Sequence, residues 1–120
     1  MIKNYVEFET LKGEIISKID VDKKENTITF HTYNGTFKMF HEQDCCEDVY
    51  IESIVGDLND LINNPITMAE EIIDELDAED GHITYTFYKL ATIKGYVDIR
   101  WNGESNGYYS ESVDLIHISK

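Results

Sequence analysis

Basic side chains are scarce in this sequence. Its 120 residues include 10 Lys and Arg against 24 Asp and Glu, so the formal net charge is −14 at neutral pH. A charge of this sign repels nucleic-acid phosphates and anionic lipid headgroups, which argues against direct binding of DNA, RNA or a membrane surface. A basic protein is therefore the natural partner to expect.

Long apolar runs are also missing. No stretch approaches the roughly 20 apolar residues that a transmembrane helix needs, and the opening MIKNYVEFET holds no apolar signal-peptide segment. We therefore expect a soluble, cytoplasmic protein. Internal repeats, linkers and low-complexity segments are absent as well, and 42% of the residues are apolar, enough for a core. A single domain over residues 1–120 follows.

The acidic side chains are unevenly placed along the chain. No Lys or Arg occurs from Met39 to Tyr88, and fourteen Asp and Glu lie there. Residues 1–38 carry six acids and six bases, and residues 89–120 carry four of each, so the centre holds the whole excess. Such a run is either a solvated, solubilising face or a surface that meets a basic partner.

Alternating apolar residues predict strands from Glu14 to Asp22, from Asn26 to Phe40 and from Val49 to Val55. Asp57 can cap a brief helix that runs to Ile62. Ile28, Phe30, Phe37 and Met39 are predicted to lie in the core.

A two-residue turn at Asn34 and Gly35 is predicted to fold the second range into a hairpin, because both residues tolerate the positive φ of a type I′ turn. With Tyr33 opposite Thr36, Ile28 would face His41, which places the His41 side chain on the apolar face.

The longest helix is predicted in the acidic centre. Asn64 is suited to the N-cap and Pro65 to the first helical position. Apolar residues then recur at helical spacing, at Ile66, Ala69, Ile72, Ile73 and Leu76. The opposite face would carry the candidate partner contacts Glu70, Glu71, Asp74, Glu75 and Asp77. An edge strand over Ile66–Ile73 remains the alternative, because so short a run fits either structure.

Three further strands are predicted at residues 82–92, 96–102 and 108–118, separated by turns at Lys94-Gly95 and Asn106-Gly107. The expected fold is α+β, a twisted antiparallel sheet of six or seven short strands with one or two helices on one side. His31, His82 and His117 are predicted to be ordinary strand residues.

The densest cluster of reactive side chains follows the hairpin, at His41-Glu42-Gln43-Asp44-Cys45-Cys46-Glu47. Imidazole, thiolate and carboxylate are the side chains that bind zinc. Four protein ligands would close a structural site, and our candidates are His41, Asp44, Cys45 and Cys46, with Glu47 as the competing carboxylate. The alternative is a pair of reduced, partly buried cysteines beside a hydrogen-bonded histidine. A disulfide between the two adjacent cysteines is not expected.

Catalysis is not predicted. Carboxylates around Cys45 and Cys46 would raise the thiol pKa and weaken a nucleophile. Dense acids such as Glu70 and Glu71 are typical of a solvated surface rather than of a glycosidase pair. No glycine-rich loop for phosphate precedes a helix.

Four stretches of the sequence also carry a resemblance. They are HEQDCCEDVYIE from His41, GDL from Gly56, TFYKLATIKGYV from Thr86 and GESNGYYSE from Gly103. Over residues 10–116 the chain resembles a family of small phage and prophage proteins with an HxQDCCE motif and no assigned activity. It is similar in particular to small acidic anti-CRISPR proteins that inhibit Cas9, and to a zinc-binding member of that group.

This resemblance implies a non-catalytic inhibitor that acts in the cytoplasm of a bacterial host. Its acidic face would occupy the positive nucleic-acid channel of a Cas9-type nuclease and block DNA. The alternative function is that of a small-ligand or signal-molecule binding protein that sequesters its ligand. The polar turn Glu104-Ser105-Asn106-Gly107-Tyr108 would then line the pocket.

Overall fold

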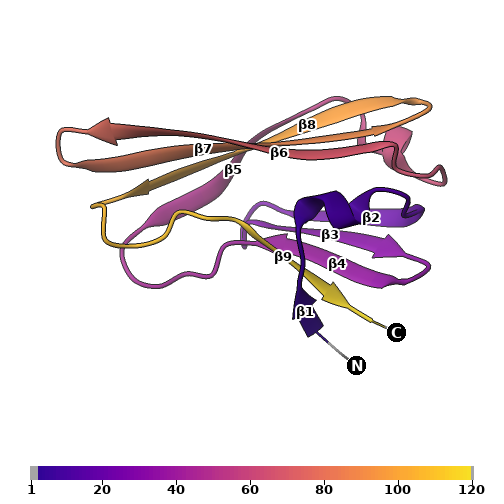
Figure 1. Cartoon of the computed structure of the whole chain (residues 1–120), viewed down its shortest axis with the longest axis horizontal. Helices are drawn as coiled ribbons and strands as arrows, with labels where there is room; N and C mark the ends of the chain where they lie inside the picture. The colour runs from indigo at the N-terminus through magenta and orange to yellow at the C-terminus, as the bar shows by residue number, and fades with distance from the viewer. Residues whose placement is uncertain (1–2, 120) are drawn as a thin grey trace.

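The computed structural model describes residues 3–119, which form two antiparallel β-sheets (Figure 1). The first sheet has the order β1-β9-β4-β3-β2 and the second the order β5-β8-β7-β6. The strands of the first sheet are β1 (Lys3–Tyr5), β2 (Ile16–Asp22), β3 (Thr27–Thr32), β4 (Gly35–Phe40) and β9 (Asp114–Ile118). Those of the second are β5 (Asp48–Val55), β6 (Met68–Ala78), β7 (Gly81–Thr92) and β8 (Gly95–Ser105).

The α+β prediction is wrong, because no α-helix occurs within residues 3–119. The helical residues form two single 3-10 turns, η1 (Phe8–Leu11) and η2 (Leu58–Leu61). η2 is the brief helix predicted after Asp57, and the Asp57 carboxylate accepts the N–H of Asn59 as expected of a cap. Within the described part of the chain, no helix is long and apolar enough to cross a membrane.

The predicted main helix is instead the strand β6, so the edge-strand alternative is the one that the structure contains. β6 pairs with β7 without a break, from Met68 opposite Ala91 to Ala78 opposite Gly81. Beyond Ala69 every residue of β6 is exposed, so neither face had to be uniformly apolar. Because neither face of β6 is buried, apolar and polar residues do not alternate along it. The spacing of its apolar residues instead matches that of a helix, which is why the sequence predicts one.

The predicted hairpin forms, but its register is shifted by two residues. Thr32 pairs with Gly35, and Ile28 pairs with Met39 rather than with His41. Of the two predicted turn residues only Gly35 has a positive φ, of 125°. A shift of two leaves every side chain on its predicted face, and the His41 side chain is accordingly buried, with 4% of its surface exposed.

The prediction of a final hairpin at Asn106-Gly107 is also wrong. β8 already lies between β5 and β7, so neither of its edges is free for another strand. The chain leaves the second sheet after Ser105, and residues 106–113 cross to the first sheet, where β9 inserts between β1 and β4. We call residues 106–113 the crossing segment.

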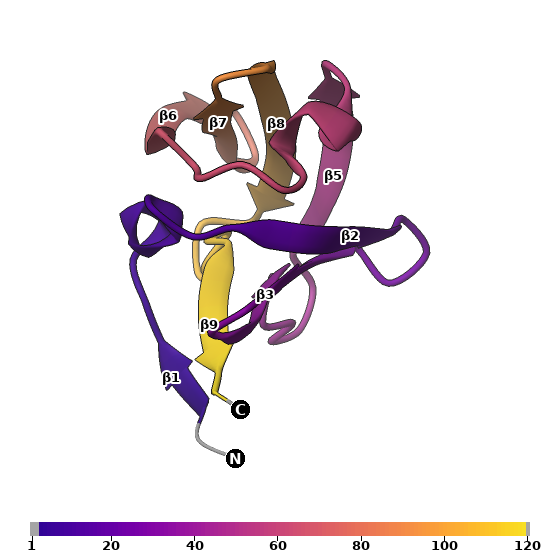
Figure 2. The ribbon, with the colours of Figure 1, turned by 90° about the vertical axis from the view of Figure 1, so that its right-hand side faces the viewer.

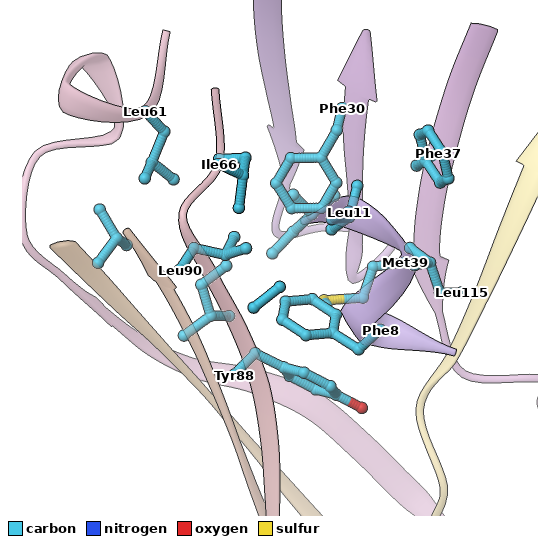
Figure 3. Close-up of a cluster of buried hydrophobic side chains, with 14 of the residues drawn as sticks. Phe8, Leu11, Phe30, Phe37, Met39, Leu61, Ile66, Tyr88, Leu90 and Leu115 are labelled. Atoms are coloured by element: carbon cyan, nitrogen blue, oxygen red, sulfur yellow. The ribbon is translucent and has the colours of Figure 1, made fainter. Parts of the chain in front are cut away.

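The core lies between the two sheets, whose strands run in crossed directions, as β2 and β5 show in Figure 2. The predicted core residues Ile28, Phe30, Phe37 and Met39 are all buried, which confirms them. The second sheet adds Ile99 and Trp101 to the core. It also adds Tyr88 and Leu90, and the short helices and their flanks add Phe8, Leu11, Leu61 and Ile66 (Figure 3). The hairpin of β6 and β7 extends past the first sheet (Figure 1).

Gly103 lets the crossing segment lie directly on β8. A Cβ atom at Gly103 would lie 2.8 Å from Cβ of Glu111 and 3.2 Å from its carbonyl oxygen. We therefore expect Gly103→Ala to lower the free energy of unfolding by about 1–3 kcal/mol, the usual cost of overpacking. Urea denaturation of the variant and of the unmodified protein measures this difference in the free energy of unfolding. Gly95→Ala is the control, because its Cβ would meet only the movable carboxylate of Asp60. Equal stability of the two variants would contradict the tight contact.

Candidate functional site

Seven carboxylates lie on β6 and the turn that follows it. We call this set the acidic edge, and its members are Glu70, Glu71, Asp74, Glu75, Asp77, Glu79 and Asp80. All seven residues are exposed. Because β6 is the last strand of its sheet, the set lies along one border of the molecule.

The five predicted partner contacts do not share one face, which corrects the helical grouping. Successive side chains of a strand point to opposite faces of the sheet. Glu71, Glu75 and Asp77 line a cleft on the inner face, whereas Glu70 and Asp74 belong to the outer face. The five side chains are therefore divided between the two faces of the sheet and do not form one flat patch.

The protein's own basic residues neutralise little of the acidic edge. The ion pairs that Lys and Arg form in the described residues join Lys18 to Asp20 and Arg100 to Glu52, away from β6. The side chain that forms ion pairs with the acidic edge when it is protonated is His82, whose Nε2 lies 3.6 Å from Glu75 and 4.0 Å from Asp77. The edge therefore presents most of its charge to solvent.

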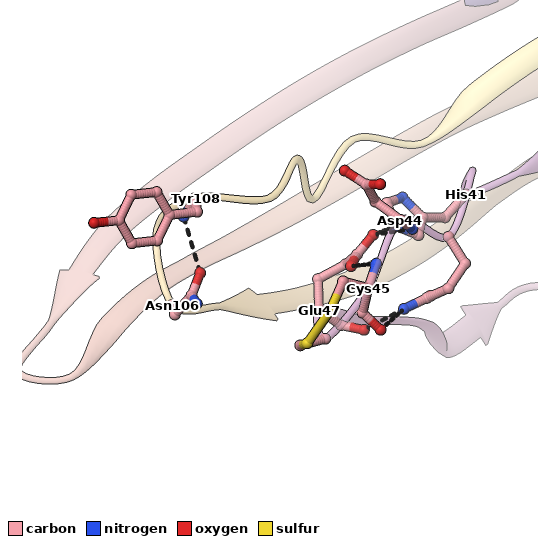
Figure 4. Close-up of a disulfide and its surroundings, with 8 residues drawn as sticks. His41, Asp44, Cys45, Glu47, Asn106 and Tyr108 are labelled. Atoms are coloured by element: carbon pink, nitrogen blue, oxygen red, sulfur yellow. Dashed lines mark hydrogen bonds and ion pairs between the residues drawn. A yellow bond between two sulfur atoms is a disulfide. The ribbon is translucent and has the colours of Figure 1, made fainter.

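A cleft of about 670 Å³ lies beside the acidic edge, between the inner face of the β6–β7 hairpin and the crossing segment. Its ionisable and aromatic lining consists of Glu71, Glu75, Asp77, His82, Tyr88, Tyr108, Tyr109 and Glu111. Of the predicted pocket turn 104–108, Gly107 and Tyr108 line this cleft. Figure 4 shows Tyr108 at the bend where its N–H bonds the Asn106 side chain.

Glu111 fastens the crossing segment to the second sheet. Its buried carboxylate accepts hydrogen bonds from Thr84 at 2.6 Å, from His82 Nδ1 at 2.9 Å and from the Ser105 hydroxyl. Burial alone would raise the pKa of Glu111, but the bonds from Ser105, Thr84 and His82 outweigh it and lower that pKa. The same hydrogen bond raises the pKa of His82. His82 is thus more than the ordinary strand residue that the sequence predicted.

The core residue Tyr88 forms a hydrogen bond with Glu71. The Tyr88 hydroxyl donates a hydrogen bond to the Glu71 carboxylate over 2.7 Å. Burial, followed by this bond to Glu71, raises the pKa of Tyr88 far above its ordinary value, so the hydroxyl remains a donor at all physiological pH values. This hydrogen bond orients the Glu71 carboxylate.

The residues of the predicted metal site gather around the carboxylate of Glu47. The Glu47 side chain is fully buried and accepts hydrogen bonds from the N–H groups of Asp44 and Cys45 and from His41 Nε2, at 2.8–2.9 Å (Figure 4). These bonds, with that from Cys45 the largest contribution, lower the pKa of Glu47 to about 2. The other ring nitrogen, Nδ1, donates to the Ser112 carbonyl over 2.6 Å.

These residues do not fit a zinc site. Both ring nitrogens of His41 are already hydrogen-bonded, and Asp44 contributes its backbone N–H to the cluster. Cys45 and Cys46 are joined by a disulfide, so the expectation of two reduced thiols is wrong. The bend at residues 45–46 that directs the Cys45 N–H to Glu47 also brings the two sulfurs together. No group of three or more His, Cys, Asp or Glu that could hold a metal ion occurs within residues 3–119.

Two central residues of this region were missed or undervalued from sequence. From sequence Glu47 is only a competing ligand, although a Glu carboxylate can reach back to a backbone N–H three residues earlier, as it does in a capping box. Glu111 had no local signal, because its partners Thr84 and His82 lie 27 and 29 residues away.

The model of one protein family matches residues 9–115, and it is described as a domain of unknown function, DUF7448. No curated protein and no solved structure matches the chain. The match covers both buried carboxylates, the acidic edge and the cleft.

The buried carboxylate of Glu47 should make stability depend on pH. Its pKa is lowered from 4.5 to about 2 in the folded state, so its contribution is complete above pH 4.5 and is lost as the pH falls through 2. We expect Glu47→Gln to unfold more easily at pH 7, because the new NH₂ group would face backbone N–H donors. The difference from the unmodified protein should shrink between pH 4.5 and 2.

Chemical denaturation at a series of pH values measures this difference. Glu42→Gln is the matched control in the same loop, since Glu42 is exposed. A difference that stays constant over the whole pH range would contradict the role of the ionised carboxylate.

Proposed function

This chain belongs to the DUF7448 family, and we propose that it is a non-catalytic protein that binds a basic nucleic-acid-binding protein and blocks it. The acidic edge is the contact surface of this proposal. A Cas9-type nuclease is the kind of target that we propose, and the cytoplasm of a bacterial host is the place of action. The proposal includes no metal and no direct contact with nucleic acid or membrane.

One observation carries the proposal: seven exposed carboxylates lie within eleven residues, 70–80, with little compensation from the chain's own bases. A surface selected only for solubility could equally carry charges of both signs spread over the molecule. Concentrated charge of one sign instead speeds encounter with a surface of opposite charge and disfavours other partners.

The shape of the molecule suits such a role. It measures 45 × 32 × 23 Å along its principal axes, and the β6–β7 hairpin forms one end of the long axis (Figure 1). Cas9-type effectors hold their guide–target duplex in a positively charged channel. A narrow, negatively charged end can enter such a channel and compete with DNA.

The buried histidine–carboxylate pair supports a structural rather than a catalytic role. A general base needs a ring nitrogen within reach of a substrate proton. His41 uses one nitrogen to hold Ser112 of the crossing segment and the other to bond Glu47. Binding without turnover is therefore our proposal for this protein.

Charge reversal within the acidic edge tests the proposal. We expect Asp74→Lys with Glu75→Lys to weaken binding to a basic nuclease at least tenfold, or about 1.4 kcal/mol, and to flatten its salt dependence. Calorimetry over a panel of Cas9-type nucleases, together with DNA cleavage assays, measures both effects. Both residues are exposed, so the fold should tolerate the change.

The control is Glu25→Lys with Asp48→Lys, which alters net charge equally at exposed positions outside the acidic edge. Equal loss of binding in both double variants would show that only net charge matters. Unchanged inhibition by the acidic-edge variant would move the interface elsewhere.

The cleft favours a second candidate function, the binding of a small cationic ligand. Three carboxylates of β6 face two tyrosines and Glu111 across it, and carboxylates with aromatic rings are suited to amines and guanidines.

A rise in the melting temperature of the protein with spermidine or arginine, lost in the double variant Glu75→Gln with Asp77→Asn, would support this function. Such binding would occupy the cleft without inhibiting a nuclease.

A further inference from the structure

We propose that the free edge of β6 receives an extended, basic strand of the partner, which adds to the second sheet through backbone hydrogen bonds. This inference rests on the proposed function, because it assigns the binding mode of the same acidic edge. It concerns the backbone and the apolar side chains of β6, whereas the proposed function concerns its charge.

β6 offers an unusually long open border. It pairs with β7 over all eleven residues and has no strand on its other side within the described residues. η1 and its flank lie beside Ala69–Ile72, so the open part of the border runs from there to Ala78. An edge strand presents a row of backbone N–H and C=O groups that a further strand can pair with.

The usual protections of an edge strand are largely missing from β6. Most strands have about 5–6 residues, and edges are commonly interrupted by bulges, prolines or lysines. β6 has eleven residues, a continuous register with β7, and neither proline nor lysine. Its protection is negative charge, which repels another acidic strand and attracts a basic one.

The side chains of β6 define what a complementary strand must carry. Ile72, Ile73 and Leu76 are exposed by 45%, 56% and 47%. They interrupt the acids in the order acid-acid-apolar-apolar-acid-acid-apolar-acid from Glu70 to Asp77. Opposite charges and apolar pairs stabilise neighbouring strands when they face each other. The matching strand therefore has pairs of basic residues alternating with pairs of apolar ones.

A second copy of this chain is a poor occupant of the border. Pairing two β6 strands would bring ten carboxylates together, five from each strand, and like charges on facing strands destabilise a sheet. A basic strand would instead place a positive charge opposite each acidic position of β6, which stabilises the pairing. Charge complementarity therefore selects a basic strand over self-association.

The peptide KKVVKKVVKK is a suitable probe, because its pattern is the same in both chain directions. The first control, KKVPKKPVKK, has the same charge, but its prolines lack the backbone donors for strand addition. The second control, KVKVKVKVKK, has the same composition but places the valines on one face. We expect the probe to bind at least tenfold more tightly than either control in calorimetry at low salt.

Amide hydrogen exchange locates the binding. The probe should slow amide exchange in β6 between Ile72 and Ala78. The double variant Ile72→Thr with Leu76→Thr should bind the probe more weakly. The control Val55→Thr, on the exposed end of the opposite edge strand β5, should bind the probe as the unmodified protein does.

Equal affinity for the probe and the proline control would overturn strand addition, since charge attraction alone would then explain binding. Protection of another strand, absence of binding, or concentration-dependent pairing of β6 with itself in sedimentation would also overturn it. None of these results depends on the nuclease experiment. If charge reversal in the acidic edge still abolished inhibition, the proposed function would stand without this binding mode.

Discussion

The structure depends on two buried carboxylates that hold the crossing segment. Glu111 fastens this segment to β7 and β8 through His82, Thr84 and Ser105. Glu47 orients His41, which in turn holds the carbonyl of Ser112. A buried carboxylate is costly unless its hydrogen bonds are satisfied, so each anchor requires a defined backbone path. Together they connect the two sheets, and the crossing segment that they hold forms one wall of the cleft.

This arrangement leaves most of β6 without a structural role, because the hairpin's bonds to Glu111 come from His82 and Thr84 of β7. Residues 70–80 are all exposed and add no buried side chain to the core, and of their carboxylates only that of Glu71 bonds a core residue, Tyr88. The concentration of acids there is therefore not demanded by folding. That freedom is the physical basis for assigning the acidic edge to a partner.

Several features could be predicted from the sequence because they depend on neighbours in the chain. The alternation of Ile28 with Phe30 and of Phe37 with Met39 identified a buried face, and a two-residue error in register left that face unchanged. The segment after Asn64 was misassigned, because its apolar spacing was decided by exposure on both faces rather than by a core. Residue type alone predicts the zinc ligands, and in the structure the ring nitrogens of His41 and the sulfurs of Cys45 and Cys46 are bonded to other partners.

The sequence by itself determined the strands β2 to β5, β7 and β8, the core residues of the first hairpin and the uneven distribution of charge, since these follow from local patterns and composition. Only the tertiary structure decided that β9 joins the other sheet, because β8 had no free edge. It also decided that Glu111 meets His82 and that β6 is an edge. Such contacts join residues far apart in the chain, and no local pattern encodes which distant partner will satisfy a buried charge.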